Sequence, residues 1–424
     1  MNDEPIAEKI ERGENEKFFT TPLIIIFVTV FIDLIGFGMV IPILPYYANT
    51  APFYATPFEI GILVGVYSLM QFFFSPILGR LSDKYGRRPI LFISILGSAL
   101  GYFVIGFAET LVLVFAGRII GGITGANIST AQAYIADITT RETRAKGMGL
   151  FGAAFGIGFI LGPAIAGVLS KYGVHVPFYF AAALSLANAV ALYFILPESL
   201  KPNVDGHIPE RRNRILEIFQ SLGQKEFGVI NLVYFLLVTA FSIMTYAFVL
   251  YTAYRFGYDP EHNGYLFAYI GVIAIITQGV LFDRLVKEFG ESPLIAIGCL
   301  LMVGSLFAVP LVGPHSGGLT ALLIGTAILS IGNSLASPAL TSLASKGADE
   351  RDQGKTMGIL QSGASLARVV GPLIGGILLN NAVNAMDDST LRRTFWTASA
   401  IMFFAFLVAL YSMRLTKIAH PPQM

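Results

Sequence analysis

The sequence has few charged residues, one tryptophan and one cysteine. Only 13% of its 424 residues are Asp, Glu, Lys or Arg, whereas a soluble domain carries about 25%. Because 54% of the residues are hydrophobic, more than a soluble core requires, the composition indicates a membrane protein. The lone Cys299 excludes an internal disulfide. The formal net charge of +1 gives no reason to expect a nucleic-acid partner.

Several sequence signals are also missing. Residues 1–20 have no apolar stretch ahead of a cleavage site, so we expect no removable signal peptide. Gly354-Lys355-Thr356 imitates the end of a nucleotide-binding loop, but the earlier glycine that such a loop requires is replaced by Asp349. There is no H-E-x-x-H or G-x-S-x-G pattern, and the five histidines fall in predicted loops or tails. We therefore expect no enzyme, no metal and no cofactor, although an intramembrane enzyme or a sensor stays open as an alternative.

Long apolar stretches are abundant. A helix needs about 20 apolar residues to cross the hydrocarbon layer. Twelve stretches qualify, near residues 22–46, 58–80, 89–108, 110–136, 147–170, 176–196, 228–254, 262–282, 293–312, 318–344, 355–379 and 393–414. We predict an all-α membrane protein with twelve transmembrane helices. Its expected parts are a cytoplasmic N-terminal tail (1–21), a six-helix bundle (22–197), a cytoplasmic linker (198–227), a second six-helix bundle (228–415) and a cytoplasmic tail (416–424).

The distribution of Lys and Arg predicts the orientation, because positively charged loops stay on the cytoplasmic side. Outside the spans, 22 of these residues fall on the side of both tails and the linker. Four fall on the other side: Lys171, Arg255, Arg392 and Arg393. We therefore expect both termini in the cytoplasm and the chain in the inner (plasma) membrane of the cell.

The two predicted bundles repeat each other. Residues of the fifth span reappear in the eleventh, each 209 positions later: Met148-Gly149, Gly162-Pro163 and Gly167 match Met357-Gly358, Gly371-Pro372 and Gly376. A weaker repeat pairs Gly79, Asp83 and Gly86 with Gly279, Asp283 and Gly290. Two related halves of this kind bind substrate between them and expose it alternately to each side of the membrane. The small residues and prolines predict close helix packing and bends, at Gly158, Gly162, Pro163, Gly371 and Pro372.

Several motifs resemble one transporter family. Residues 79–88 read Gly-Arg-Leu-Ser-Asp-Lys-Tyr-Gly-Arg-Arg, which resembles the signature between the second and third spans of the major facilitator superfamily. Residues 113–118 with Gly121, Gly122 and Gly125 resemble its fourth-span motif, and residues 158–163 its antiporter motif. Residues 33–45 are similar to the first-span motif of the twelve-span drug:proton antiporters, and Pro197-Glu198-Ser199 ends span six as in the tetracycline efflux branch. The resemblance implies two pseudo-symmetric six-helix bundles and a drug:proton antiporter.

The resemblance to the tetracycline branch stops in the third span. Those exporters carry an acidic residue there, whereas this chain reads Ala99-Leu100-Gly101-Tyr102. Spans eight and nine also lack the His and Asp that those exporters place in the membrane. The motifs therefore imply the branch and leave the substrate open.

The resemblance also implies a role for three charged residues at the cytoplasmic side. Asp83, Arg87 and Asp137 are expected to form a charge network, a conformational latch that stabilises the outward-open state. The alternative is ordinary solvated loop charge, worth under about 1 kcal/mol for each exposed pair.

Asp33, Arg118 and Arg368 lie well inside predicted spans. Each charge costs about 2.5 to 3.5 kcal/mol at such a depth, so each requires a partner or a wet cavity. A buried carboxylate near an arginine can bind and release a proton during a transport cycle. We predict that Asp33 carries the coupling proton and that Arg118 tunes it. The alternative is a static ion pair that holds spans one and four together.

Polar side chains at helical spacing predict the substrate cavity. Arg118 shares a helix face with Gly122, Gly125, Ser129 and Gln132, although the glycines are equally suited to close packing. Tyrosines with an apolar ring and a polar tip suit an amphipathic solute, or else pack between helices or contact lipid. The predicted cavity residues are Tyr67, Gln71, Gln132, Tyr265, Tyr269, Asn333, Gln361 and Arg368.

These observations predict a proton-coupled secondary transporter in the lipid bilayer. We expect a monomer that exports a small amphipathic organic compound by alternating access, with protons as the coupling ion. An uncoupled facilitator and a proton-linked carrier of organic anions or sugars stay open as alternatives. No motif names the substrate, because one methylene or one charge in a cavity changes specificity by about 10-fold or more.

Overall fold

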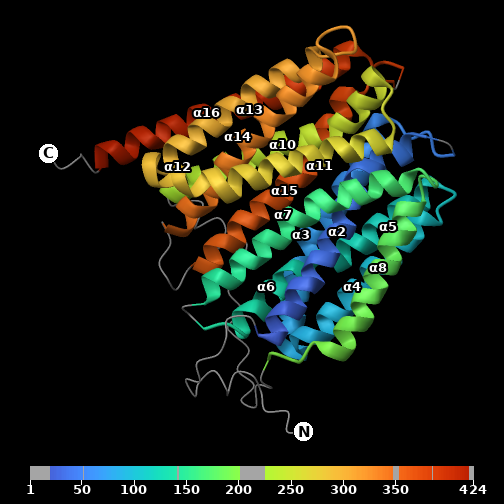
Figure 1. Cartoon of the computed structure of the whole chain (residues 1–424), viewed down its shortest axis with the longest axis vertical. Coiled ribbons are helices and arrows are strands. Elements are labelled where there is room, and N and C mark those ends of the chain that lie inside the picture. The colour runs from blue at the N-terminus through green and yellow to red at the C-terminus, as the bar shows by residue number, and fades with distance from the viewer. Residues whose placement is uncertain are drawn as a thin grey trace. The chain divides into compact units, whose positions relative to one another are not determined.

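The computed structural model describes residues 20–50, 52–140, 143–200, 225–346, 353–383 and 385–419. Nearly all of these residues lie in helices (Figure 1). Most of the predicted N-terminal tail (1–21), linker (198–227) and C-terminal tail (416–424) lies outside the described residues.

The helices follow the predicted spans. The first half of the chain forms α2 (Thr21–Asn49), α3 (Pro57–Tyr85), α4 (Arg87–Gly106), α5 (Leu111–Thr124), the 3-10 segment η1 (Gly125–Asn127), α6 (Ile128–Asp137), α7 (Arg144–Ser170) and α8 (Val176–Ile195). The second half forms α10 (Lys225–Phe256), α11 (Pro260–Ile276), the π-helical η2 (Thr277–Leu281), α12 (Phe282–Phe289), α13 (Glu291–Ala308), η3 (Val309–Leu311), α14 (Gly318–Lys346), α15 (Gln353–Leu379) and α16 (Asp388–Ala419).

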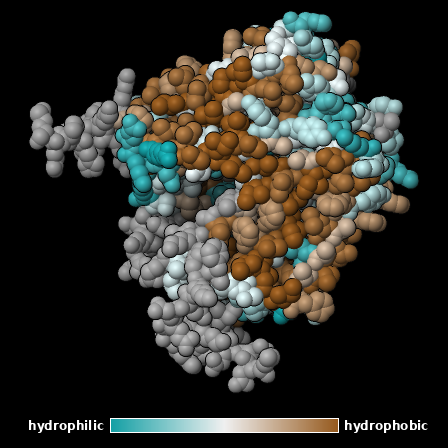
Figure 2. Space-filling model, in the orientation of Figure 1, coloured by the Kyte–Doolittle hydropathy of each residue, from teal (hydrophilic) through white to brown (hydrophobic). Residues whose placement is uncertain are grey.

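The length and composition of these helices suit a membrane. In the described part of the chain, eleven helical segments are long and apolar enough to cross one, and α7 contributes the shorter apolar stretch Gly156–Ser170. On the face shown in Figure 2, hydrophobic residues cover much of the surface of the described part of the chain. The predicted all-α membrane fold is confirmed.

Two spans are less regular than the sequence indicated. η1 interrupts the fourth span at Gly125–Asn127. A Cβ atom at Gly125 would lie 2.3 Å from the hydroxyl oxygen of Tyr67, so the glycine makes room for that tyrosine. The eighth span widens into the π-helical turn η2 before it continues as α12 to Phe289. Such π-helical turns are often found at functional sites.

Side chains cap the free backbone N–H groups at the beginning of several helices. At α3, Glu59 Oε2 accepts a hydrogen bond from the backbone N–H of Thr56 (2.8 Å), and Thr56 Oγ1 accepts one from the N–H of Glu59 (3.3 Å). At α16, Asp387 and Thr390 exchange equivalent bonds of 2.8 and 2.9 Å. These reciprocal caps satisfy amides that the helix itself leaves without partners. They define where both helices begin.

Contacts between Cα atoms divide the chain into two units. Unit 1 contains residues 1–54, 66–209 and 260–268, and unit 2 contains residues 55–65, 210–259 and 269–424. Within unit 1, α2 packs along α7, and α4 contacts both α5 and α8. Within unit 2, α13 packs along α14, and α10 contacts both α15 and α16. Each unit therefore includes one helix end from the other half of the sequence.

The repeated glycine and proline pattern explains how these helix ends are held. In unit 1, a Cβ atom at Gly264 of α11 would lie 2.6 Å from the carbonyl oxygen of Pro163 on α7. In unit 2, a Cβ atom at Gly61 of α3 would lie 2.5 Å from the carbonyl oxygen of Pro372 on α15. Only glycine permits backbones to approach this closely. The repeat thus forms the same kind of crossing twice, α7 with α11 and α15 with α3.

Candidate functional site

Asp33 lies on α2 and contacts the break in the fourth span. Its Oδ2 accepts a hydrogen bond of 3.2 Å from Nδ2 of Asn127, the last residue of η1. Asn127 is only 5% exposed. Asp33, Asn127 and Thr29 supply the polar groups of a cavity of about 10 Å³ whose other walls are apolar residues of α2, α4 and α6. A cavity of this size and polarity has room for about one water molecule.

Arg118 is buried on α5 and stacks on Tyr67. The guanidinium carbon lies 4.3 Å from the centroid of the Tyr67 ring, and Arg118 is 5% exposed. This cation–π contact stabilises the charge in an apolar setting. A Cβ atom at Gly122 would lie 2.5 Å from the carbonyl oxygen of Tyr67. Gly122 and Gly125 therefore form the surface on which Tyr67 packs.

Tyr102 on α4 packs against α2 near Asp33. It is buried, and a Cβ atom at Gly36 would lie 3.3 Å from its hydroxyl oxygen. Tyr102 thus crosses α2 three residues beyond Asp33. Sequence reasoning missed its role because a tyrosine in an apolar span is usually a packing residue. The useful signal is its place in the stretch where the tetracycline branch carries an acid.

Aromatic side chains of α2, α3 and α7 extend the site. The ring centroid of Phe37 lies 5.4 Å from that of Tyr67 and 5.7 Å from that of Phe159. Gln71 Nε2 donates a hydrogen bond of 2.8 Å to the carbonyl oxygen of Gly125. Gln132 on α6 is partly exposed. The structure therefore brings Tyr67 and Gln71 together with Arg118, and it adds Phe37 and Phe159.

The cavity residues predicted in the second half have separate partners. The Tyr269 hydroxyl donates to the carbonyl oxygen of Leu323 (3.3 Å). Arg368 Nη2 donates to Ser365 Oγ on its own helix (3.2 Å). Gln361 is exposed and Asn333 is partly exposed. Their assignment to a substrate cavity stays a prediction.

Tyr265 belongs to the crossing of α7 and α11. Its hydroxyl donates to Glu261 Oε1 (2.9 Å), and the same oxygen accepts from Lys171 Nζ at 2.8 Å. This hydrogen bond raises the pKa of Lys171 above its usual value. In the structure Tyr265 thus supports an ion pair at the end of α7.

The three residues expected to form the latch lie together. Arg87 Nε donates to Asp137 Oδ2 (3.1 Å), and Arg87 Nη1 forms an ion pair with Asp83. The Arg87 side chain is 9% exposed, whereas that of Asp83 is 61% exposed. Ser199 Oγ donates to the same oxygen of Asp137 (3.1 Å). Charge-assisted hydrogen bonds of this kind are stronger than neutral ones, and the role of the network in transport stays a prediction.

Glu198 adds a residue that sequence reasoning did not place in this network. Its carboxylate accepts hydrogen bonds from the backbone N–H groups of Arg87 (2.9 Å) and Arg88 (3.1 Å), at the beginning of α4. Gly86 precedes them with φ of 101°, and a Cβ atom there would lie 2.4 Å from Glu198 Oε2. Glu198 therefore caps α4 from a point 111 residues along the chain from Arg87.

The predicted packing residues make close contacts. A Cβ atom at Gly158 would lie 2.8 Å from Cβ of Leu34, and one at Gly162 would lie 2.7 Å from the carbonyl oxygen of Ile35. A Cβ atom at Gly371 would lie 2.6 Å from Cβ of Ser242. These contacts hold α7 on α2 and α15 on α10. The crossings at Pro163 and Pro372 add α11 to α7 and α3 to α15.

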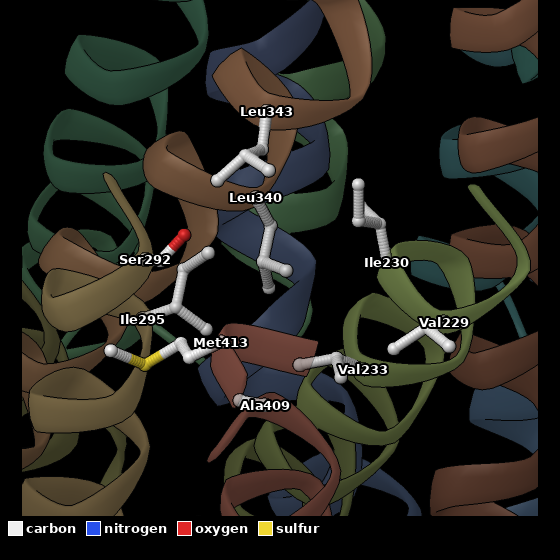
Figure 3. A pocket seen from close by; sticks show the side chains of 9 residues that line it. All are labelled: Val229, Ile230, Val233, Ser292, Ile295, Leu340, Leu343, Ala409 and Met413. Atoms are coloured by element: carbon white, nitrogen blue, oxygen red, sulfur yellow. The ribbon is translucent and has the colours of Figure 1, made fainter. Parts of the chain in front are cut away.

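A second cavity lies in unit 2 between α10, α13, α14 and α16 (Figure 3). It measures about 20 Å³ and is lined by apolar side chains and one serine: Val229, Ile230, Val233, Ser292, Ile295, Leu340, Leu343, Ala409 and Met413. Leu343 lies three residues before the end of α14, as the larger Tyr134 does on α6. Tyr134 is fully buried, and its hydroxyl donates to the carbonyl oxygen of Pro197 (2.9 Å). We interpret the cavity as a packing difference between the two halves.

Comparison with known proteins identifies the class of this chain. The sequence profile of the Major Facilitator Superfamily matches residues 26–349 and 284–423. A class H tetracycline resistance protein of Pasteurella multocida is 33% identical over 406 residues, covering 92% of this chain and 95% of the relative. Multidrug resistance protein 1 of Bacillus subtilis is 34% identical over 365 residues, covering 85% of this chain and 90% of the relative.

Solved structures share the fold. A peptide transporter, POT, superposes with a TM-score of 0.78 at 16% identity, covering 97% of this chain and 98% of that one. The human organic anion transporter MFSD10 gives a TM-score of 0.68 at 23% identity, covering 92% and 99%. The protein is a multi-pass membrane transporter rather than an enzyme. It belongs to the Major Facilitator Superfamily, among the drug efflux proteins of that family.

Proposed function

We propose that the protein is a proton-coupled antiporter that exports a small amphipathic organic compound. The observation that carries the proposal is Asp33, an acid inside the first span whose carboxylate is held by Asn127 beside a water-sized cavity. A carboxylate in such a place can gain and lose a proton as its surroundings change. The tetracycline and multidrug resistance proteins among its relatives support drug export.

The aromatic residues next to Asp33 supply the substrate surface in this proposal. Phe37, Tyr67 and Phe159 present rings that suit an apolar, aromatic solute, and the Gln71 carboxamide adds a polar group. Phe37 lies one helical turn from Asp33 on α2. A proton on Asp33 therefore removes a negative charge next to this aromatic surface.

The proposal includes the setting of the protein. Both termini lie in the cytoplasm, a placement that the positions of Lys and Arg support. The chain acts as a monomer in the inner membrane. The two halves rock around the substrate and expose it alternately. The Asp83–Arg87–Asp137 network acts as the cytoplasmic latch of this cycle.

The test replaces Asp33 with asparagine, which mimics the permanently protonated acid. In proteoliposomes loaded with tetracycline or ethidium, Asp33→Asn should keep solute exchange and lose accumulation driven by a pH gradient. Glu109→Gln removes an exposed carboxylate and serves as the control with normal accumulation. Full gradient-driven accumulation by Asp33→Asn would contradict proton transfer at this residue.

The same experiment separates the alternatives. An uncoupled facilitator equilibrates the solute whatever the pH gradient. A static structural role for Asp33 predicts instead that the variant loses about 1.5 to 3 kcal/mol of stability, because the hydrogen bond from Asn127 loses its charged acceptor. Asp33→Glu, which keeps the carboxylate, then decides whether the acid is needed for coupling, and Asp137 is the next acid to test.

A further inference from the structure

The third-span helix of each half begins in the same way. α4 begins directly after Gly86, whose φ is 101°, and α13 begins directly after Gly290, whose φ is 77°. The first residue of α4 is Arg87 and the first residue of α13 is Glu291. The two halves therefore place opposite charges at equivalent positions.

Glu291 has an oppositely charged partner at the end of the next helix. Lys346 Nζ forms an ion pair with Glu291 Oε1, and Ser342 Oγ donates to the same oxygen (3.1 Å). Lys346 is the last residue of α14, as Asp137 is the last residue of α6. Lys346 also follows Asp137 by the same 209 positions that separate the repeated residues of spans five and eleven. The position is thus equivalent by structure and by sequence.

Burial follows the same order in both pairs. The side chains of Arg87 and Asp137 are 9% and 26% exposed, and those of Glu291 and Lys346 are 14% and 67% exposed. In each half the residue on the third-span helix is the less exposed member of the pair. A serine hydroxyl supports the carboxylate in each pair, Ser199 at Asp137 and Ser342 at Glu291.

The inverted charge also explains a difference between the halves. A helix N-terminus favours a negative charge and disfavours a positive one. Glu291 supplies a negative charge to the N-terminus of α13 directly, whereas Arg87 places a positive charge at that of α4. There the carboxylate of Glu198 binds the first backbone N–H groups and compensates. Only attraction within each pair matters for holding two helices together, so the sign is free to differ.

We propose that Glu291 and Lys346 form a second latch, equivalent to Arg87 and Asp137 but with inverted charge. The pair holds the ends of α13 and α14 together so that they move as one piece during transport. Glu291 is a positioning residue in this role. The inference rests on the proposed transport function and extends the latch from one half of the chain to both.

The test measures pH-driven uptake of tetracycline and ethidium into inverted vesicles. Glu291→Gln and Lys346→Gln should each lower the maximal rate by about threefold, which corresponds to about 0.7 kcal/mol on the barrier. The KM should stay within about twofold, because neither residue binds substrate. Lys287→Gln removes an exposed cation of α12 and should transport at the wild-type rate.

A charge exchange distinguishes an ion pair from a loss of folding. The double variant Glu291→Lys with Lys346→Glu should transport faster than either single variant at equal yield, and its melting temperature should fall slightly, because the exchange places a positive charge at the N-terminus of α13. Full rates in both single variants, or a folded double variant as slow as either, would overturn the second latch. Absence of gradient-driven uptake in the wild-type protein would overturn the proposed function first, and the latch role with it.

Discussion

Single residues determine how α4 begins and how the charge network next to it is held. Glu198 binds two backbone N–H groups there while Arg87 binds Asp83 and Asp137. The Glu198 carboxylate compensates the positive end of the α4 helix dipole. The Arg87 guanidinium stays available for Asp83 and Asp137. The end of the sixth span is thereby joined to the beginning of the third.

Glu198→Gln tests this cap. The amide keeps the size of the side chain but loses the charge, so we expect a loss of about 1 kcal/mol of stability and a reduced transport rate. Melting temperature and tetracycline uptake should fall together. Glu288→Gln, an exposed carboxylate on α12, is the control. An unchanged melting temperature in Glu198→Gln would show that the cap contributes nothing to stability.

The sequence identified charged residues more readily than neutral ones. Asp33, Arg118 and Asp83 stand out because a charge in or beside an apolar span is costly. Asn127 and Tyr102 carry no charge, so nothing in their local sequence separates them from packing residues. Glu198 was visible as part of a motif, but its partners are 111 and 110 residues away. Only the folded chain brings them together.

Whole helices meet at the two glycine crossings. The pattern in the sequence predicted close packing, and the structure shows which helices meet: α7 with α11 in unit 1, and α15 with α3 in unit 2. The pairing of helices from different halves of the chain could not be predicted from one sequence, because a glycine indicates a close approach without naming the partner. The break at η1 was hidden for a similar reason, since Gly125 packs against the distant Tyr67.

Gly264→Ala and Gly61→Ala test the crossings. Each added methyl group would meet a carbonyl oxygen at 2.6 or 2.5 Å, and backbone cannot move aside cheaply. We expect each variant to lose about 1 to 3 kcal/mol of stability and to transport slowly. The control is Gly304→Ala on α13, where no atom lies within 4 Å of the added methyl and alanine favours the helix. Equal melting temperatures for Gly264→Ala and Gly304→Ala would contradict the close contact.

At the scale of the whole molecule, the latch is expected to act on conformational exchange rather than on folding. The Asp83 side chain is 61% exposed, so Asp83→Asn should change stability by less than about 1 kcal/mol. Transport should nevertheless fall, because Arg87 loses one of its two carboxylates. Asp283→Asn, at the repeated position on α12, provides the comparison. Normal uptake by a well-expressed Asp83→Asn protein would remove the latch from the proposed mechanism.

The two crossings impose an order on how the chain is made. Gly61 meets Pro372, a residue that the ribosome adds about 300 residues later. At about 5 to 20 residues per second, that interval lasts roughly 15 to 60 s. During this interval the beginning of α3 is present in the nascent chain, but α15, which will pack against it, has not been made. Pro163 and Gly167 of α7 lack their partner α11 for a shorter time. Completion of the fold therefore waits for the last spans, and chaperones or the insertion machinery would meet the first half with this glycine surface still open.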